Sequence, residues 1–262
     1  MRLTQAELDA SALDPATLRL AVEQVRVNGY VVFEGVLPGD VVDELHENFM
    51  RLFRRHTDST DQNRGANRYQ MHLPFAPPFS APHIVTSPFA LPVIRALLGD
   101  DCVCQYFASD TPMPGSEYQA VHSDIHRLFP GMPVAPPTFA VVLNVPLVDF
   151  REDNGPVEIW PGGTHLMPED ANMLELAESM DSRPCIMPRG SLLIRDIRMW
   201  HRGTPNRSGA PRPNMAMIHA RHWLRTSYPP IGIPQATYDG LSEDGQRLFP
   251  LEDIGAHAGR YA

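Results

Sequence analysis

The first third of the chain carries apolar residues at helical spacing. Asp14-Pro15 is a favourable helix start, because an aspartate accepts hydrogen bonds from the first turn and proline is tolerated there. Asn28-Gly29 is a stop signal, so the pattern predicts an amphipathic helix between these points. Its apolar stripe consists of Leu18, Ala21, Val22 and Val25.

Further elements follow before residue 100. Tyr30-Val31-Val32-Phe33 is β-branched and aromatic, which predicts a strand. Pro38-Gly39-Asp40 opens a second helix, and a short helix is predicted near 92–98. Residues 54–88 are polar and then proline-rich, which is typical of a loop that can wall an active site. The apolar face of the second helix is Val42, Leu45, Phe49, Leu52 and Phe53.

From Val103 onward short apolar segments alternate with turn signals, which predicts strands. A helix is expected between them at about 169–180. A barrel of short strands would bring segments that are remote in the sequence close together. The predicted strands are 103–108, 117–122, 138–147, 156–160, 184–187, 190–195, 199–202 and 214–222.

Composition sets the scale of the molecule. With 262 residues and 43% hydrophobic content, the chain can bury one substantial core. We therefore expect a single domain, 1–262. Its helical N-terminal part covers about 1–100, its β core about 101–225 and its C-terminal tail 226–262.

Charge narrows the choice of partners. The net charge of 22 − 31 = −9 argues against nucleic acid and anionic membranes, which both attract clustered basic residues, and favours a small-molecule substrate. No apolar run of 18 residues and no signal peptide is present, so we expect a cytoplasmic protein with no membrane association. Cys102, Cys104 and Cys185 are expected to be buried thiols. The oligomeric state is left open.

The candidate chemistry lies in His122-Ser123-Asp124 and in His201, 77 residues after Asp124. Chance alone gives about one His-x-Asp in such a chain, so the motif needs its context. Residues two apart on a strand share a face, so His122 and Asp124 can point at one ion if the chain stays extended. Two imidazoles and one carboxylate can hold one face of Fe(II) and leave the other face open for a reaction.

Several motifs in order resemble the phytanoyl-CoA dioxygenase family of Fe(II)- and 2-oxoglutarate-dependent oxygenases, over about residues 20–225. The resemblance implies a mainly β fold with flanking helices, a double-stranded β-helix of the jelly-roll, cupin-like kind. The motifs are the Gly29–Phe33 strand, Gln119–Asp124, Asp153–His165, Trp200–Asn206 and Arg212.

The resemblance also implies a cofactor set and its ligands. His122, Asp124 and His201 match the catalytic iron ligands, and the cosubstrates are 2-oxoglutarate and O2. Arg212 lies eleven residues after His201, where the family places the basic residue that grips the distal carboxylate of 2-oxoglutarate. A guanidinium suits this task, because it pairs with a carboxylate through two parallel hydrogen bonds.

Three further cofactor-binding candidates follow from the resemblance. Gln119 matches a position that holds the metal-side carboxylate of the cosubstrate in some members; its alternative is a structural glutamine. Arg68 matches a segment that contributes a basic residue or substrate contacts near the iron. Thr204 offers a hydroxyl to the cosubstrate pocket, although local hydrogen bonding in its turn is the alternative.

The implied activity is oxidation, by default hydroxylation, of an unactivated C–H bond in a small organic molecule, with release of succinate and CO2. A secondary metabolite or biosynthetic intermediate is the favoured substrate. Desaturation, epoxidation and rearrangement would use the same residues, whereas halogenation is disfavoured because Asp124 fills the position of the halide. The alternatives are a zinc-dependent cupin-like hydrolase or isomerase and a non-catalytic binding homologue.

The substrate wall is assigned only loosely. Candidate wall residues are Met71, His72 and His126, and the loops 56–85 and 126–137 and the tail after Tyr228 are expected to line the pocket. Other conspicuous side chains receive structural roles. His165 is expected to be structural, not a ligand, and Trp160 and Trp200 are expected in the core.

Overall fold

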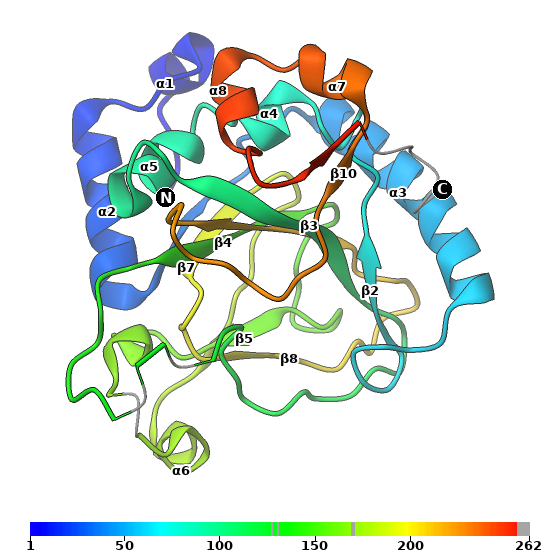
Figure 1. Cartoon of the computed structure of the whole chain (residues 1–262). Helices are drawn as coiled ribbons and strands as arrows, with labels where there is room; N and C mark the ends of the chain where they lie inside the picture. The colour runs from blue at the N-terminus through cyan, green and yellow to red at the C-terminus, as the bar shows by residue number, and fades with distance from the viewer. Residues whose placement is uncertain (127, 130, 169–170, 256–262) are drawn as a thin grey trace.

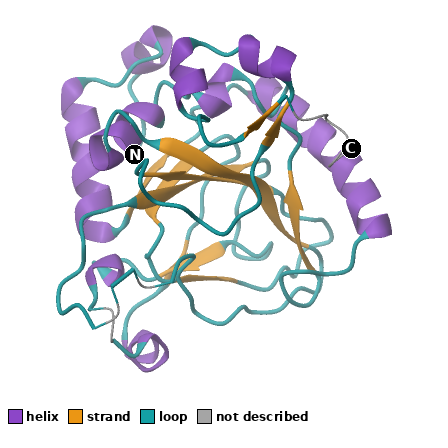
Figure 2. Ribbon diagram, in the orientation of Figure 1, coloured by secondary structure: helices purple, strands orange, loops and turns teal. Residues whose placement is uncertain are grey.

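Two antiparallel sheets lie in the middle of the molecule, and helices cover one face of the larger sheet (Figures 1 and 2). The structure is a computed structural model that describes residues 1–126, 128–129, 131–168 and 171–255. The mainly β architecture with flanking helices agrees with the prediction.

The larger sheet has six strands in the order β1-β7-β4-β9-β3-β2, and every neighbouring pair is antiparallel. This order brings together strands that are far apart in the sequence, which is how a jelly roll assembles one site from remote segments. The strands are β1 (Tyr30–Phe33), β2 (Arg68–His72), β3 (Val103–Pro112), β4 (Ala140–Pro146), β7 (Leu192–Asp196) and β9 (Asn214–Ala220).

The smaller sheet has the order β6-β5-β8 and lies below the larger sheet in Figure 1. A cluster of buried residues that includes Val157 on β5 and Leu193 on β7 joins the two sheets. A separate parallel pair, β10 with β11, closes the C-terminal part. These strands are β5 (Val157–Ile159), β6 (Arg183–Pro184), β8 (His201–Gly203), β10 (Gly232–Ile233) and β11 (Asp253–Ile254).

Most helices lie around the outer face of the larger sheet, and α6 lies beside the smaller sheet (Figure 1). The longest is α3, whose buried face is that of the predicted second helix. The helices are α1 (Gln5–Ala10), α2 (Pro15–Asn28), α3 (Gly39–Ser59), α4 (Pro82–Val85), α5 (Leu91–Leu98), η1 (Thr164–Leu166), α6 (Met173–Ser179), α7 (Gln235–Asp239) and α8 (Glu243–Arg247).

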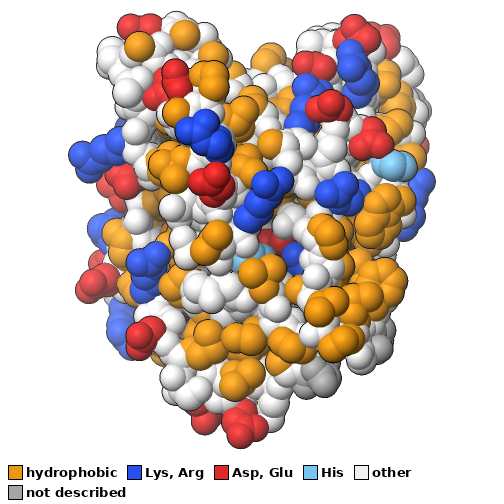
Figure 3. All heavy atoms as spheres, turned by 90° about the vertical axis from the view of Figure 1, so that its left-hand side faces the viewer, with side chains coloured by type: hydrophobic (Ala, Val, Ile, Leu, Met, Phe, Trp, Pro, Cys, Tyr) orange, Lys and Arg blue, Asp and Glu red, His pale blue; other side chains and the backbone are white. Residues whose placement is uncertain are grey.

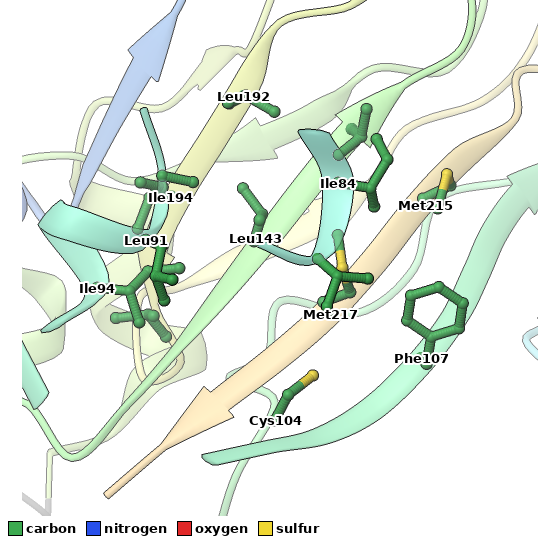
Figure 4. Close-up of a cluster of buried hydrophobic side chains, with 14 of the residues drawn as sticks. Ile84, Leu91, Ile94, Cys104, Phe107, Leu143, Leu192, Ile194, Met215 and Met217 are labelled. Atoms are coloured by element: carbon green, nitrogen blue, oxygen red, sulfur yellow. The ribbon is translucent and has the colours of Figure 1, made fainter. Parts of the chain in front are cut away.

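Alternate residues of the central strands serve two different interiors. On β4, Val141 and Leu143 enter the large core beneath the helices, whereas Ala140 and Val142 belong to a smaller cluster on the other face. Figure 4 shows the helix side, where Ile84 of α4 and Leu91 and Ile94 of α5 pack over strand residues such as Leu143. The opposite, inner face is therefore free to carry polar side chains.

Most predicted elements agree with the structure. Asp14 caps α2 through a 2.8 Å hydrogen bond from the Ala16 N–H to its carboxylate. The predicted helix at 169–180 is α6, with residues 169–170 outside the described part of the chain. The three cysteines are buried and free, and burial raises the pKa of Cys102 and Cys185 to about 11.

Two predictions were wrong in detail. The segment 117–122 is not a strand, because its partner β8 is only three residues long and pairing is reduced to an isolated bridge between His122 and His201. The supposed loop 54–88 contains the end of α3, all of β2 and α4. Strand β2 has a largely polar sequence, and its pairing with β3 decides its conformation.

Within the described residues, none of the helices combines the length and the apolar character needed to cross a membrane.

Acid stability should depend on His219, which lies on β9, is 2% exposed and has no partner for Nδ1 among the described residues. Burial lowers its pKa to about 4. The unfolded chain binds this proton more readily, so stability is complete above pH 6.5 and falls as the pH drops toward 4. The loss is at most about 3 kcal/mol.

Replacement His219→Leu should remove this pH-dependent part. Thermal unfolding at pH 7.5 and pH 4.5 measures it: the melting temperature of the variant should fall less than that of the wild type. Met217→Leu is the matched control, because it changes the same strand without a titratable group. An equal fall for His219→Leu and wild type would show that His219 does not set the acid limit.

Candidate active site and metal centre

The side chains of His122, Asp124 and His201 come together between the sheets. Their donor atoms all lie within 4.8 Å of one another. The Oδ1 atom of Asp124 is 3.5 Å from Nε2 of His201 and 3.8 Å from Nε2 of His122. The two imidazole rings are 4.3 Å apart between centroids. The structure thus brings the three predicted ligands into one cluster.

Backbone hydrogen bonds produce this cluster. The N–H of His122 donates to the carbonyl of His201, and the N–H of His201 donates back, both at 3.0 Å. Two residues later the N–H of Asp124 donates to the carbonyl of Ile197 at 3.1 Å. Each end of the His-x-Asp motif is therefore fixed to the segment that leads into β8.

Both histidines are oriented by their own backbone surroundings. Nδ1 of His122 is 2.8 Å from the carbonyl of Ala120, and Nδ1 of His201 is 2.9 Å from that of Met199. A carbonyl only accepts, so each Nδ1 carries the proton and each Nε2 presents a lone pair to the cluster. Burial and the neighbouring His201 lower the pKa of His122, which favours the neutral imidazole that a metal requires.

A buried arginine stands behind the carboxylate. Arg195 on β7 is 5% exposed, and its Nη2 donates a hydrogen bond to Oδ2 of Asp124. Burial alone would raise the pKa of Asp124, but Arg195 together with the two histidines holds it well below its usual range. Asp124 is therefore a carboxylate anion at neutral pH.

These residues fit a divalent metal ion of the iron group. Two neutral imidazoles and one carboxylate are the donor set of non-heme Fe(II) oxygenases. The two Nε2 atoms and Oδ1 of Asp124 lie close together, and none of the three carries a proton that it could donate. A cation among them would satisfy all three atoms.

A cavity lies next to this cluster on the inner face of the larger sheet. His122, Asp124 and His201 line one side, and Asn144 of β4 and Asn214 of β9 line the polar floor. Within the described residues, Oδ1 of both asparagines is buried without a hydrogen-bond partner. Figure 3 shows one face of the molecule, on which histidine, acidic and basic side chains gather at a hollow with hydrophobic side chains below it.

Arg212 is fully buried and lies beside Asp110, which lines the cavity. Its Nε donates to the carbonyl of Gly155 at 3.0 Å, and its guanidinium lies over the ring of Phe150 at 4.2 Å. Neither Nη1 nor Nη2 has a hydrogen-bond partner among the described residues. Burial lowers the pKa of Arg212 to about 9, so the side chain is still a cation at pH 7. Two unsatisfied donors on one buried cation favour a bound carboxylate.

The loop between β8 and β9 is built to hold Arg212. Asn206 is fully buried, and its Nδ2 donates to the carbonyls of Pro112 and Ala210 at 3.0 and 2.8 Å. Gly155 has φ +79°, as the Asn-Gly turn predicts, and a Cβ there would lie 2.9 Å from the carbonyl oxygen of Thr204. This glycine allows the chain to turn its carbonyl toward Arg212.

Arg68 is also buried and lies beneath β8. Its Nη2 donates to the carbonyl of Thr204 at 3.0 Å, and its Nη1 is 3.3 Å from Oδ2 of Asp110. The same Asp110 oxygen is 3.7 Å from Nη2 of Arg212. A Cβ at Gly203 would lie 2.5 Å from the guanidinium of Arg68, so a larger residue there would displace this guanidinium. Arg68 thus forms an ion pair with Asp110 and a hydrogen bond with the backbone of Thr204.

The side chains of Gln119 and Thr204 form hydrogen bonds within the protein. Oε1 of Gln119 accepts a hydrogen bond from the N–H of Gly203 at 2.9 Å, and its Nε2 donates to the carbonyl of Arg64 at 3.4 Å. The hydroxyl of Thr204 donates to the carbonyl of Pro156 at 2.7 Å. Gln119 still lines the cavity, but in this structure both side chains make the structural contacts that were the alternative reading.

The proposed substrate wall needs correction. Met71 is 5% exposed and packs in the core beneath the helices, because its position on β2 points away from the inner face. His72 lies edge-on to Tyr106, which lines the cavity, with ring centroids 5.8 Å apart. His126 lines a second, neighbouring pocket. Tyr228 of the C-terminal part does line the cavity.

Residues outside the site behave as the sequence suggested. Nε2 of His165 lies 3.1 Å from the carbonyl of Arg26, and this histidine is not part of the metal cluster. Trp160 and Trp200 are buried together in one small hydrophobic cluster.

Sequence reasoning missed Arg195, Asn144, Asn214 and Asp110. The signal for Asn144 was a single polar residue inside the otherwise apolar strand Ala140–Pro146, and the signal for Arg195 was a charged residue that follows the apolar run at the start of Leu192–Asp196. Such a residue is costly in a core and is retained where it has a partner or a ligand.

Fold and site together define a jelly-roll protein with a candidate two-histidine, one-carboxylate metal centre. A family model described as phytanoyl-CoA dioxygenase (PhyH) matches residues 25–214, and the chain belongs to this family. The enzymes of the family use Fe(II), 2-oxoglutarate and O2, so the predicted family and cofactors are confirmed at that level.

Individual relatives are more distant. Dioxygenase af480 of Aspergillus fumigatus is 25% identical over 181 residues, which are 66% of this chain and 55% of that protein. The chain therefore spans about half the length of this curated relative.

Solved structures share the fold. AviO1 from Streptomyces viridochromogenes Tue57 has a TM-score of 0.64 at 21% identity, over 82% of this chain and 100% of its own. SnoN, the non-heme alpha-ketoglutarate-dependent epimerase from nogalamycin biosynthesis, has a TM-score of 0.62 at 20% identity, over 79% of this chain and 84% of its own. At these identities the likeness concerns the fold alone.

The metal cluster predicts a selective loss of metal binding. His122→Ala should weaken binding of Fe(II) or Co(II) at least about 100-fold, because one of three protein donors is lost. Anaerobic calorimetry measures the dissociation constant. The matched control is His126→Ala, which changes a histidine four residues away that does not face the cluster. Equal weakening in both variants would argue against a metal centre at His122.

Proposed function

We propose that this protein is an Fe(II)- and 2-oxoglutarate-dependent dioxygenase that oxidises, and by default hydroxylates, a C–H bond of a small organic molecule. The observation that carries the proposal is that the cavity beside the His122, Asp124 and His201 cluster is also lined by Asp110. The guanidinium of Arg212, with two unsatisfied nitrogens, lies 3.7 Å from Asp110. When bound, the iron couples decarboxylation of 2-oxoglutarate to succinate with oxidation of the substrate.

The chain supplies positions and charge for this reaction. His122, Asp124 and His201 hold the metal through two imidazole nitrogens and one carboxylate oxygen. Arg212 receives the distal carboxylate of 2-oxoglutarate on Nη1 and Nη2. The amides of Asn144 and Asn214 line the floor and offer further hydrogen bonds to the cosubstrate.

The charge balance favours a dianionic cosubstrate. Two guanidiniums, Arg68 and Arg212, stand beside the single carboxylate of Asp110, which leaves one positive charge for one distal carboxylate. The arginine arrangement therefore supports the oxygenase over the cupin-like hydrolase or isomerase.

The mixed character of the wall supports a small organic substrate. Tyr106, Ile218 and Tyr228 offer apolar surface, while Arg64 and Gln70 offer hydrogen bonds. The segment 56–85 contributes Arg64 and Gln70 to this wall, whereas 126–137, in which 127 and 130 are outside the described residues, borders the second pocket. Tyr228 lines the cavity, but among the described residues none of the tail after Tyr228 does, so that part of the expectation was wrong. A secondary metabolite or biosynthetic intermediate suits such a wall, and a related fold serves nogalamycin biosynthesis.

Cosubstrate binding tests the proposal directly. Anaerobic addition of Fe(II) and 2-oxoglutarate to the purified protein should produce a weak visible charge-transfer band, because the 2-oxo acid chelates the iron. Exposure to O2 should then release succinate, and mass spectrometry of candidate substrates should show added oxygen in the product. A folded, iron-loaded protein that gives neither band nor succinate would refute the proposed function.

Arg212 should govern the affinity for 2-oxoglutarate. Arg212→Met should raise the dissociation constant about 10- to 100-fold, because a charge-assisted hydrogen-bonded pair contributes about 1.5–3 kcal/mol. Arg212→Lys should lie between variant and wild type. Titration of the visible band measures the constant, and the exposed Arg207→Met is the control. An unchanged constant in Arg212→Met would place the distal carboxylate elsewhere.

A further inference from the structure

The two oxygens of Asp124 have different surroundings. Oδ1 faces Nε2 of His201 at 3.5 Å and Nε2 of His122 at 3.8 Å. Oδ2 accepts the hydrogen bond from Nη2 of Arg195. The carboxylate is thus divided between the metal cluster and a guanidinium.

The backbone of Arg195 is held by strand pairing on both sides. Arg195 is the fourth residue of β7, where Tyr30 of β1 is its partner on one side and Val142 of β4 on the other. Its side chain is 7% exposed. Because the backbone is held in the middle of a sheet and the side chain is enclosed, the guanidinium has little freedom to follow a moving carboxylate.

Asp124 is also the charge partner on which Arg195 depends. Nη1 of Arg195 lies 3.5 Å from Nδ1 of His201, but that nitrogen already donates its proton to Met199, so two donors meet there. Nε of Arg195 is buried without a partner in the described part of the chain. If Oδ2 left the guanidinium, a buried cation would lose its ion pair, which is strongly unfavourable.

We propose that Arg195 is a positioning residue that restricts Asp124 to one donor oxygen toward the metal. The inference rests on the proposed function. Three protein donors leave three of six octahedral positions, two for the chelating 2-oxo acid and one for O2. A carboxylate that bound through both oxygens would leave only two positions, and the 2-oxo acid would fill them. Arg195 therefore keeps the last position free.

Binding of nitric oxide, a stable substitute for O2, tests whether one coordination position stays free when 2-oxoglutarate is bound. Fe(II)-loaded wild type, Arg195→Met and Arg195→Lys are titrated with nitric oxide anaerobically, with and without saturating 2-oxoglutarate, and the iron–nitrosyl signal is followed by electron paramagnetic resonance. Without 2-oxoglutarate all three proteins should bind nitric oxide alike. With 2-oxoglutarate, Arg195→Met should bind it at least tenfold more weakly, while Arg195→Lys, which keeps a cationic donor, should stay near the wild type.

The pattern separates positioning from general damage. A residue that only stabilises the fold or the metal would change nitric oxide binding equally in both conditions, and this outcome would overturn the inference. So would unchanged binding in Arg195→Met with 2-oxoglutarate present. If Arg195→Met does not fold, Arg195→Leu is the second neutral variant. A wild type without the visible band would instead refute the proposed function and the inference together.

Discussion

The double backbone hydrogen bond between His122 and His201 is the constraint on which the site depends. It joins a loop that follows β3 to the first residue of β8, so two imidazoles from remote parts of the sequence face one point. The carboxylate of Asp124 lies near the same point because the N–H of Asp124 donates a hydrogen bond to the carbonyl of Ile197. The positions of the three side chains that would hold the metal are thus set by main-chain pairing, which is less adaptable than side-chain packing.

The rest of the fold provides the stability that this buried polar arrangement requires. The outer face of the larger sheet packs a continuous apolar core against the helices, and this core includes Leu143 and Met217. Their strand neighbours Asn144 and Ile218 point to the inner face, where the cavity lies. Buried Arg68, Arg195 and Arg212 are costly there unless paired. Because every second residue of a strand changes face, one strand serves both purposes.

The sequence predicted what depends on local pattern and missed what depends on tertiary partners. His122, Asp124, His201 and Arg212 stand in recognisable short motifs. The structure brings the first three into one cluster and places Arg212 beside Asp110, which lines the same cavity. The helix α2 was predictable from its cap and stripe. Strand β2 was not, because its polar residues carry no period-two signal and only pairing with β3 extends them. Arg195 was missed because nothing in Leu192–Asp196 reveals that its guanidinium meets Asp124.

The choice of basic residue has a physical meaning for this site. The chain contains no lysine, so all 22 of its basic residues are arginines. In the interior each guanidinium divides its nitrogens between different contacts. Arg68 binds Asp110 and the carbonyl of Thr204, whereas Arg212 binds the carbonyl of Gly155 and keeps two nitrogens without a hydrogen-bond partner among the described residues. An ammonium group is a compact point charge and does not offer donors in such a fixed plane. A planar guanidinium can donate a hydrogen bond to a backbone carbonyl and still present further N–H groups to a carboxylate.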